Sequence, residues 1–427
     1  MKYKFEGDGI MEKSINEKTI ECLNCKSKPC TKGCPLGNNM PEVINLINQN
    51  KIEEAYRELE KTTLLPAICG RICPHMSQCM GKCIKGIKGE PVLIGQIETF
   101  IGDNAIKNKW IFKKGEQKNK KIAIIGSGPA GLTCAGFLAI KGYDVTIYEK
   151  NSELGGLLRY GIPEFRLDRE KLKQSINRIL ELGIKVKCGF ELGKNLEMNE
   201  LESMYDGIFI AIGANIPWKM EIEGEDLEGV YGGNTLLYKL ENGEIIPDFK
   251  NKSVAIIGGG NVAMDCARTI KKLGAGNVKV IYRREREQMP AEKNEIEDAI
   301  EEGIEFLFKN NIVKIIGSKK VEKIECIKTE LIKKQDDDRL TPINIDNSNY
   351  ELDIDYIVMA IGSQTEKETL IKSNLELDKY GYIKVDENFK TSNKKVWAGG
   401  DVIGSRATVA WASYFGRTVA ENIDKSF

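Results

Sequence analysis

The sequence lacks an excess of charge and lacks long apolar runs. Its 63 lysines and arginines balance 63 aspartates and glutamates, so nothing global favours binding to nucleic acid or to an anionic membrane. No run of 18 apolar residues is present, and the first 21 residues are charged and lack the apolar core of a signal peptide. The sequence therefore predicts a soluble cytoplasmic protein with neither a nucleic-acid nor a membrane partner.

Histidine is nearly absent, since His75 is the only one in 427 residues. Histidine is the most common general acid or base near neutral pH, and one imidazole does not make a site alone. We therefore interpret His75 as structural. The length predicts two or three domains, and a hydrophobic content of 41% is ample for packed cores.

Cysteine, by contrast, is concentrated near the N-terminus. Eight of the twelve cysteines form two sets, each with a Cys-Pro pair. The sets read Cys22-x2-Cys25-x4-Cys30-x3-Cys34 and Cys69-x3-Cys73-x5-Cys79-x3-Cys83. A reducing compartment disfavours a disulfide framework. Zinc sites favour two separated Cys-x2-Cys knuckles, whereas this spacing with its prolines is typical of iron–sulfur proteins. We predict iron–sulfur ligands, with zinc or free thiols as alternatives, and we expect crossed pairing between the sets.

A dinucleotide-binding fingerprint follows. An apolar run at residues 122–125 predicts a strand, Leu132–Ile140 a helix, and Asp144–Tyr148 a second strand that ends at Glu149. Three glycines make the turn: the first for its tightness, the second for approach of a pyrophosphate, the third for helix packing. A purely structural turn is the alternative. The predicted ligand-contacting residues are Gly126, Gly128, Pro129, Ala130, Gly131 and Glu149.

The glycine-rich stretch Leu154–Pro163 is too rich in glycine for an ordinary helix. We predict a loop lying against the ligand, with a surface crossover as the alternative. Its candidate contact residues are Gly155, Gly156, Leu157, Arg159 and Ile162.

A second fingerprint lies downstream and ends in alanine, which the motif permits. Its candidate residues are Gly258, Gly260, Asn261, Val262 and Ala263. The strand Val278–Tyr282 leads into Arg283 and Arg284 rather than an acid. Guanidinium groups suit a 2′-phosphate, so we predict NADP(H) over NAD(H). The alternative is a solvated patch in which arginines alternate with Glu285 and Glu287.

The remaining elements indicate how the parts connect. Two apolar strands at residues 207–211 and 356–360 each lead into Ala-Ile-Gly, ending at Gly213 and Gly362, and resemble crossings between two domains. A strand before Gly400 and Asp401 closes the first fold, with Asp401 a candidate partner of a ribityl hydroxyl. A helix from Thr408 to Thr418 could face a flavin ring. Residues 41–61 predict a two-helix hairpin, 168–182 a helix, and 317–349 exposed hairpin strands.

We therefore predict an α/β protein in which an N-terminal α-helical iron–sulfur domain precedes two Rossmann-like domains, the second inserted in the first. The expected division is an arm at 1–20, an iron–sulfur domain at 21–115, an FAD domain at 116–215 and 360–427, and an NAD(P)H domain at 216–359. This arrangement resembles the two-domain flavoprotein reductases. Dithiol chemistry is excluded because no Cys-x-x-Cys follows Cys83. The isolated Cys134 and Cys266 are predicted to be packing residues.

With the cysteine sets included, the chain resembles a narrower family. That family contains the small (beta) subunit of NADPH-dependent glutamate synthase, the large subunit of the reduced ferredoxin:NADP oxidoreductase, and the N-terminal half of dihydropyrimidine dehydrogenase. The resemblance runs from Glu21 to about Thr418. It is carried by the cysteine sets, residues 155–167, residues 258–265, and Arg283-Arg284 with Met289-Pro290.

The resemblance implies FAD, NADP(H) and two [4Fe–4S] clusters. By position, one cluster would be held by Cys22, Cys25, Cys30 and Cys83, and the other by Cys34, Cys73, Cys79 and Glu98. The alternative for Glu98 is an exposed helix residue, and Cys69 is left without a cluster role.

The implied function is electron transfer between NADPH and a partner subunit, as the glutamate synthase small subunit beside its large subunit. One alternative is the large subunit of a bifurcating ferredoxin:NADP oxidoreductase, beside a ferredoxin-reductase-like small subunit. Others are a stand-alone NAD(P)H-dependent flavoprotein reductase and a non-catalytic redox-sensing flavoprotein. We expect no side chain to act as acid, base or nucleophile, because the cofactors carry the chemistry.

Overall fold

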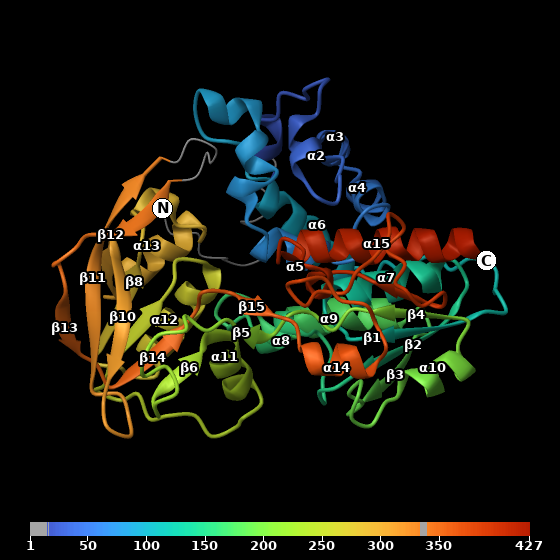
Figure 1. The fold of residues 1–427 in the computed structure, drawn as a ribbon. Helices are drawn as coiled ribbons and strands as arrows, with labels where there is room; N and C mark the ends of the chain where they lie inside the picture. Colours follow the sequence, from blue (N-terminus) through green and yellow to red (C-terminus); the bar gives the residue numbers. More distant parts are fainter. Residues whose placement is uncertain (1–14, 16, 334–339) are drawn as a thin grey trace. The chain divides into compact units, whose positions relative to one another are not determined.

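The structure, a computed structural model, describes residues 15, 17–333 and 340–427, which form two compact units (Figure 1). The first unit takes in the chain up to Arg159, then Glu164–Gly213 and Thr365–Phe427. The second takes in Tyr160–Pro163 and Ala214–Gln364, so it is inserted in the first, as predicted. Most of the predicted N-terminal arm lies outside the described residues.

The N-terminal part of the first unit is helical. Its elements are α2 (Pro29–Gly33), α3 (Met40–Asn48), α4 (Ile52–Glu60), α5 (Pro66–Ile72), η1 (His75–Ser77), η2 (Met80–Lys82), η3 (Ile84–Ile87) and α6 (Ile94–Lys107). The predicted two-helix hairpin is confirmed as α3 and α4. Each of the two helices buries one apolar face, with Ile47 and Leu59 fully covered.

A five-stranded parallel sheet with the order β16-β4-β1-β2-β3 forms the centre of the first unit. Its strands are β1 (Lys121–Ile125), β2 (Asp144–Glu149), β3 (Lys185–Cys188), β4 (Gly207–Ile210) and β16 (Val396–Ala398). Every residue from Ile122 to Ile125 is buried, because helices cover both faces of such a sheet. β16 arrives from the far end of the chain and pairs with β4.

The helices around this sheet differ from the sequence prediction at two places. These helices are α7 (Pro129–Ile140), α8 (Leu157–Tyr160), α9 (Arg169–Leu180), α10 (Met198–Met204), α14 (Lys367–Lys372), η5 (Asp401–Ile403) and α15 (Val409–Ser426). α7 begins at Pro129 rather than Leu132, because proline suits the first helical position. The stretch predicted as a loop contains the single turn α8. α9 confirms its prediction, and Asp168 caps it by accepting from the Lys171 amide at 2.8 Å.

The second unit repeats the architecture with the strand order β6-β14-β7-β8-β9, all parallel. Its sheet and helical elements are β6 (Val230–Gly232), α11 (Gly233–Glu241), β7 (Ser253–Ile257), α12 (Asn261–Lys272), β8 (Asn277–Tyr282), η4 (Arg286–Gln288), α13 (Lys293–Glu301), β9 (Glu305–Phe308) and β14 (Tyr356–Met359). A separate two-stranded pair joins β5 (Ile216–Pro217) to β15 (Ser363–Gln364).

An antiparallel ribbon covers one side of this second sheet. It consists of β10 (Asn310–Ile316), β11 (Lys323–Ile332), β12 (Thr341–Asn344) and β13 (Tyr350–Asp353). The prediction of hairpin strands in this region is confirmed for β11 and β12. The prediction that they are exposed is wrong for β11, because Ile324 and Cys326 are fully buried in a core shared with Ile257 and Ile281.

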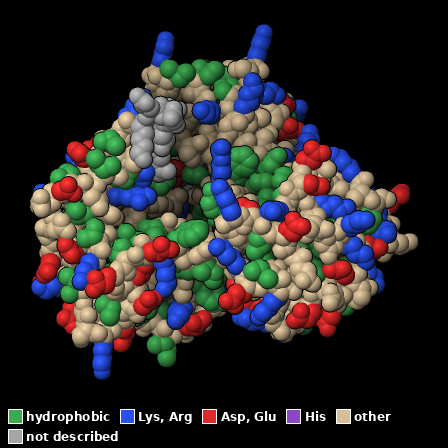
Figure 2. Space-filling view, viewed as in Figure 1, with side chains coloured by type: hydrophobic (Ala, Val, Ile, Leu, Met, Phe, Trp, Pro, Cys, Tyr) green, Lys and Arg blue, Asp and Glu red, His purple; other side chains and the backbone are tan. Residues whose placement is uncertain are grey.

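The surface agrees with the balanced composition. Basic and acidic side chains are interspersed over the face shown in Figure 2. No helix in the described part of the chain combines the length and apolar character needed to cross a membrane.

Candidate functional site

The first glycine turn joins β1 to α7 in the first unit. Gly126 has a φ of +100°, and a Cβ there would lie 2.5 Å from the Ala211 carbonyl oxygen. A Cβ on Gly131 would lie 2.0 Å from the Gly126 carbonyl oxygen, whereas one on Gly128 would meet nothing within 4 Å. The three glycines thus have the predicted geometry: a tight turn, an open position for a phosphate and a close helix contact. α7 begins at Pro129 beside that open position, and the amides available there start at Ala130, because proline has no N–H.

Glu149 ends β2 next to this turn and is almost fully buried. Its Oε2 accepts from the Ser127 amide at 3.0 Å and from the Ser127 hydroxyl at 2.5 Å. Its Oε1 accepts from the Asn151 amide at 2.9 Å. The carboxylate is therefore fixed in the position from which the fingerprint predicts contact with a ribose.

The Gly155–Gly156 segment lies against the same turn. The Gly155 amide donates to the Ser127 hydroxyl at 3.0 Å, and a Cβ on Gly156 would lie 2.8 Å from Cα of Gly128. Leu157 and Arg159 follow as half-buried residues of α8, and Ile162 belongs to the short segment assigned to the second unit. This position favours a ligand-contacting segment over a surface crossover.

The closing turn after β16 completes the first site. A Cβ on Gly400 would lie 3.1 Å from the Ala130 Cβ, at the start of α7. Asp401 accepts from the Ser405 hydroxyl at 2.7 Å, and burial raises the pKa of Asp401. Thr408 caps α15 by accepting from the Trp411 amide at 3.3 Å. Gly213 ends the first unit's crossing after β4 with a positive φ.

The second glycine turn joins β7 to α12 in the second unit. A Cβ on Gly258 would lie 2.3 Å from the Ala360 carbonyl oxygen, whereas one on Gly260 would meet only Pro290, at 3.9 Å. Asn261 accepts from the Glu292 amide at 3.0 Å. Val262 is half-buried and Ala263 fully buried. Gly362, after the second crossing, has a φ of +117°.

The two arginines after β8 differ in their surroundings. Arg283 is exposed, whereas Arg284 is only 9% exposed and its Nε donates to the Leu340 carbonyl at 3.1 Å. The sequence treats the two as equivalent phosphate ligands. The guanidinium of Arg284 binds the carbonyl of Leu340, just before β12, whereas Arg283 has the more exposed side chain.

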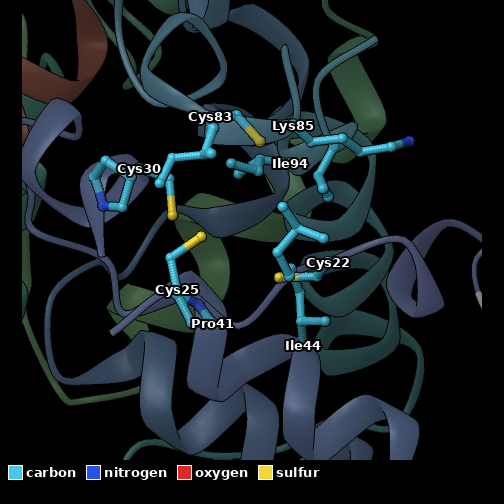
Figure 3. Close-up of a pocket in the computed structure, with 12 residues that line it drawn as sticks. Cys22, Cys25, Cys30, Pro41, Ile44, Cys83, Lys85 and Ile94 are labelled. Carbon is cyan, nitrogen blue, oxygen red and sulfur yellow. The ribbon is translucent and has the colours of Figure 1, made fainter. Parts of the chain in front are cut away.

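Three cysteines of the first set and one of the second line a pocket in the N-terminal part. Cys22, Cys25, Cys30 and Cys83 line it together, and Figure 3 shows their sulfur atoms around one space. Cys83 thus joins three residues of the first run, which is the crossed arrangement that the resemblance implies. The described residues contain no group of three His, Cys, Asp or Glu that would hold a single metal ion. A [4Fe–4S] cluster spreads its cysteine ligands more widely than one ion does.

Cys34 of the first set gathers with Cys73 and Cys79 of the second around Glu98. Burial, and then the neighbouring Glu98 carboxyl, raise the pKa of Cys34 to about 12. Burial and the charges of Cys34 and Glu98 likewise raise the pKa of Cys79. A hydrogen bond with Cys69, followed by burial, raises the pKa of Cys73. The structure therefore brings these thiols and the carboxyl together, and it also places Cys69 beside Cys73.

Glu98 itself is only 5% exposed, so its interpretation as an exposed helix residue is wrong. Burial raises its pKa to about 8, against the hydrogen bond that Asn38 donates at 3.0 Å. Asn38 in turn accepts from the Thr62 hydroxyl at 2.7 Å. The sequence gives no signal for Asn38 or Thr62, because neither belongs to a motif and the contacts span distant segments.

α15 connects the second cysteine set to the first glycine turn. Cys69 and Cys73 pack with Ala410 in its first turn. Gln78, from the cysteine region, donates to the Thr408 hydroxyl at 3.3 Å. A Cβ on Gly416 would lie 2.2 Å from the Ala130 carbonyl oxygen, so α15 also lies directly on α7. One helix therefore touches both candidate cofactor sites of the first unit.

The remaining candidates behave as packing residues. Cys134 and Cys266 are fully buried and burial raises the pKa of each thiol, which confirms their predicted role. His75 packs against Gly95, whose added Cβ would lie 2.5 Å from Cε1 of the ring. Burial lowers the pKa of His75 to about 4, so the ring is neutral at pH 7, in line with a structural role.

Both the N-terminal cysteine-rich part and the rest of the chain match known protein families. Residues 120–416 match the family model of pyridine nucleotide-disulphide oxidoreductases. Residues 2–110 match that of dihydropyrimidine dehydrogenase domain II with its 4Fe-4S cluster. The glutamate synthase [NADPH] small chain of Escherichia coli is 34% identical, over 94% of this chain and 89% of that protein.

A relative with a different name and a solved structure are also similar to this chain. The NADP(+)-dependent formate dehydrogenase subunit beta of Moorella thermoacetica is 35% identical over 93% of this chain and 59% of that protein. Mycobacterium tuberculosis FprA in complex with NADPH has a similar fold, with a TM-score of 0.64 and 19% identity over 72% of this chain and 85% of that one.

Proposed function

Because the chain belongs to the pyridine nucleotide-disulphide oxidoreductase family, and within it to the family of glutamate synthase small chains, we propose the following assignment. The protein is an NADPH-dependent flavoprotein oxidoreductase of the cytoplasm. It exchanges electrons with NADPH and delivers them through iron–sulfur clusters to a large partner subunit. As a glutamate synthase small chain, it supplies the electrons for glutamate formation on that partner.

One observation carries this proposal: a single helix, α15, contacts both the second cysteine set and the first glycine turn. A chain that only bound a dinucleotide would have no need to pack Cys69 and Cys73 against a helix of that fold. The direct packing gives electrons a continuous protein path inside one unit.

The first glycine turn is proposed to hold FAD. Gly128 leaves open space at the start of α7, where the pyrophosphate would lie. Glu149 would accept from the ribose, and Asp401 at the closing turn would accept from a ribityl hydroxyl. When bound, FAD takes up two electrons as hydride and releases them singly, which matches one-electron clusters. The chain's own contribution is to bind, orient and enclose.

The second glycine turn is proposed to hold NADP(H), with the 2′-phosphate at Arg283. The absence of an acid after β8 supports this choice, since a carboxylate there would repel the phosphate.

Two [4Fe–4S] clusters are proposed, with the ligands Cys22, Cys25, Cys30 and Cys83 for one and Cys34, Cys73, Cys79 and Glu98 for the other. The convergence of the four sulfurs in Figure 3 supports the ligand group that contains Cys83. The burial of Glu98 among thiols supports the other group.

A second candidate function is that of an electron-transferring subunit with the same cofactors but a partner other than the glutamate synthase large subunit, such as a formate dehydrogenase. The Moorella relative is as similar as the Escherichia coli one and has a different name. Relatives of equal similarity thus carry the names of two different enzymes, glutamate synthase and formate dehydrogenase.

Reconstitution tests the assignment. The purified holoprotein should oxidise NADPH with ferricyanide as acceptor, and glutamate should form from 2-oxoglutarate and glutamine only after a glutamate synthase large subunit is added. Turnover with ferricyanide but none with the large subunit would favour the second candidate. A flavoprotein that never turns over would refute both.

A further inference from the structure

Three hydrogen bonds hold the loop that follows β8: one to β11 of the antiparallel ribbon, and two to residues that directly precede β10 and β12. The Thr329 hydroxyl, on β11, donates to the Arg283 carbonyl at 2.9 Å. The Lys309 amide donates to the Arg284 carbonyl at 3.0 Å, and Arg284 Nε donates to the Leu340 carbonyl at 3.1 Å. Thr329 is 3% exposed. The carbonyl of the residue proposed to select the coenzyme is therefore satisfied from inside the ribbon.

The same loop is tied at its other end to the second glycine turn. The Ala291 amide donates to the Gly259 carbonyl at 3.1 Å, and the Glu292 amide donates to Asn261 at 3.0 Å. Between these ends, the Tyr282 hydroxyl donates to the Gln288 carbonyl at 2.7 Å. The backbone at Arg283 thus has its position defined by the ribbon on one side and the phosphate-binding turn on the other.

We propose that the ribbon sets coenzyme selectivity, with Thr329 and Arg284 as positioning residues that aim the exposed Arg283 at the 2′-phosphate. The inference rests on the proposed NADP(H) site. It also reassigns Arg284, which the sequence groups with Arg283 as a direct phosphate ligand. A charged fork recognises a phosphate only in a narrow range of orientations, so loosening the backbone beneath Arg283 weakens recognition without removing any charge.

The test is steady-state kinetics of the holoprotein with ferricyanide as acceptor and either NADPH or NADH as donor. Thr329→Val keeps the shape of the side chain and removes the donor to the Arg283 carbonyl. We expect the ratio of kcat/KM for NADPH to that for NADH to fall about 3- to 10-fold, through the KM for NADPH. Thr329→Ser, which keeps the hydroxyl, should restore most of the ratio.

Two controls separate positioning from general damage. Thr269→Val makes the same chemical change at a buried threonine of the same unit, whose hydroxyl has no partner among the described residues, and should leave the ratio unchanged. Arg283→Ala should lower the ratio about 10- to 100-fold. Adding Thr329→Val to Arg283→Ala should lower it no further, because Thr329 acts through Arg283.

The outcomes are distinguishable. If Thr329→Val lowers kcat/KM equally for NADPH and NADH, the positioning role is refuted. It is also refuted if Thr329→Val still lowers the ratio in the Arg283→Ala background. If Arg283→Ala itself leaves the ratio unchanged, the proposed NADP(H) site fails, whatever Thr329 does. Arg284→Lys keeps the charge and loses the Nε donor, so a reduced ratio supports positioning and an unchanged ratio contradicts it.

Discussion

Glu98 is a carboxyl group in surroundings that do not favour its charge. It is buried among thiols with one amide donor, from Asn38, and its pKa is raised to about 8. A buried carboxylate is retained at such a position when a cation or further donors compensate it. Iron of a cluster would supply that positive charge, which gives the ligand assignment a physical basis beyond position in the chain.

Replacement of Glu98 tests this directly. Glu98→Ala should lower the iron content from about eight per chain toward about four, or change the electron paramagnetic resonance spectrum of one cluster while the other stays as it was. Glu90→Ala, at an exposed glutamate of the same region, is the matched control and should change neither. An unaltered iron content and spectrum in Glu98→Ala would remove Glu98 from the ligand set.

Alanine substitutions at two glycines of the first turn should have different effects. A Cβ on Gly131 would lie 2.0 Å from the Gly126 carbonyl oxygen, whereas one on Gly128 meets only open space. Gly131→Ala should therefore lower the stability of the protein by about 1–3 kcal/mol, by overpacking. Gly128→Ala should fold normally yet lose FAD, because the methyl group occupies the place of the pyrophosphate.

The measurements for this pair are flavin content after purification and the urea midpoint of the flavin-free protein. Both variants should retain less FAD than the parent, and only Gly131→Ala should unfold at lower urea. Full flavin occupancy in Gly128→Ala would contradict the proposed phosphate position.

Among the elements, α15 is the one that packs on α7 and also contacts residues of the second cysteine set. The sequence predicts it only as far as Thr418, but it continues to Ser426. Its last turn is held by Asp424, which accepts from Lys141 at 2.8 Å, from the Tyr143 hydroxyl at 3.1 Å and from Lys118. These donors lie 281 to 306 positions earlier in the chain, so no local pattern predicts the length of the helix.

Asp424 should give this anchor a dependence on pH. Burial alone would raise its pKa, but the bonds from Lys118, Lys141 and Tyr143 outweigh it and lower the pKa to about 2. A lowered folded-state pKa contributes stability above the ordinary value near 3.8 and loses it as the pH falls toward 2. Asp424→Asn should therefore unfold more readily than the parent by up to about 1 kcal/mol at pH 7 and pH 5.

Urea midpoints at pH 7, 5 and 3 check this expectation. The difference between Asp424→Asn and the parent should stay constant from pH 7 to 5 and shrink at pH 3. Glu421→Gln, on the same helix in a looser exposed pair with Arg417, should show almost no difference. A gap that grows on acidification would contradict the sign of the pKa shift.

Local chemistry explains which elements were predictable. Both glycine turns, the strands beside them and the α3–α4 hairpin depend on short-range patterns, and the sequence predicts them well. The single turn α8 was missed because its helical φ and ψ follow two glycines at positive φ, a combination that reads as a loop. The burial of Arg284 was missed because its acceptor, Leu340, lies 56 residues away. The contact between Asn38 and Glu98 was missed for the same reason, since 60 residues separate them.

At the scale of the whole molecule, the chain separates two kinds of chemistry. The second unit carries the turn proposed for NADP(H), and the first unit carries the turn proposed for FAD together with both cysteine sets. The insertion of one fold in the other leaves the closing strand β16 and α15 to be supplied by the end of the chain. The helix that packs on α7 of the first fold thus also packs against Cys69 and Cys73.

This separation predicts that the two halves of the reaction can be uncoupled. Cys73→Ala removes a proposed ligand of the set that packs against Ala410 and leaves the glycine turns untouched. NADPH should still bleach the flavin of this variant in a single-turnover experiment at close to the parental rate. Steady-state electron delivery to a glutamate synthase large subunit should fall by more than about tenfold, because the route through the second cluster is broken.

Cys69→Ala is the matched control for that experiment, since Cys69 is a buried cysteine directly beside Cys73 and has no proposed ligand role. It should retain iron and transfer electrons to the large subunit. If Cys69→Ala loses a cluster and Cys73→Ala keeps it, the ligand set is misassigned but the electron path survives. If neither change affects electron transfer, electrons leave the flavin by a route that avoids the second cysteine set. The proposal that α15 links the flavin site to these cysteines is then refuted.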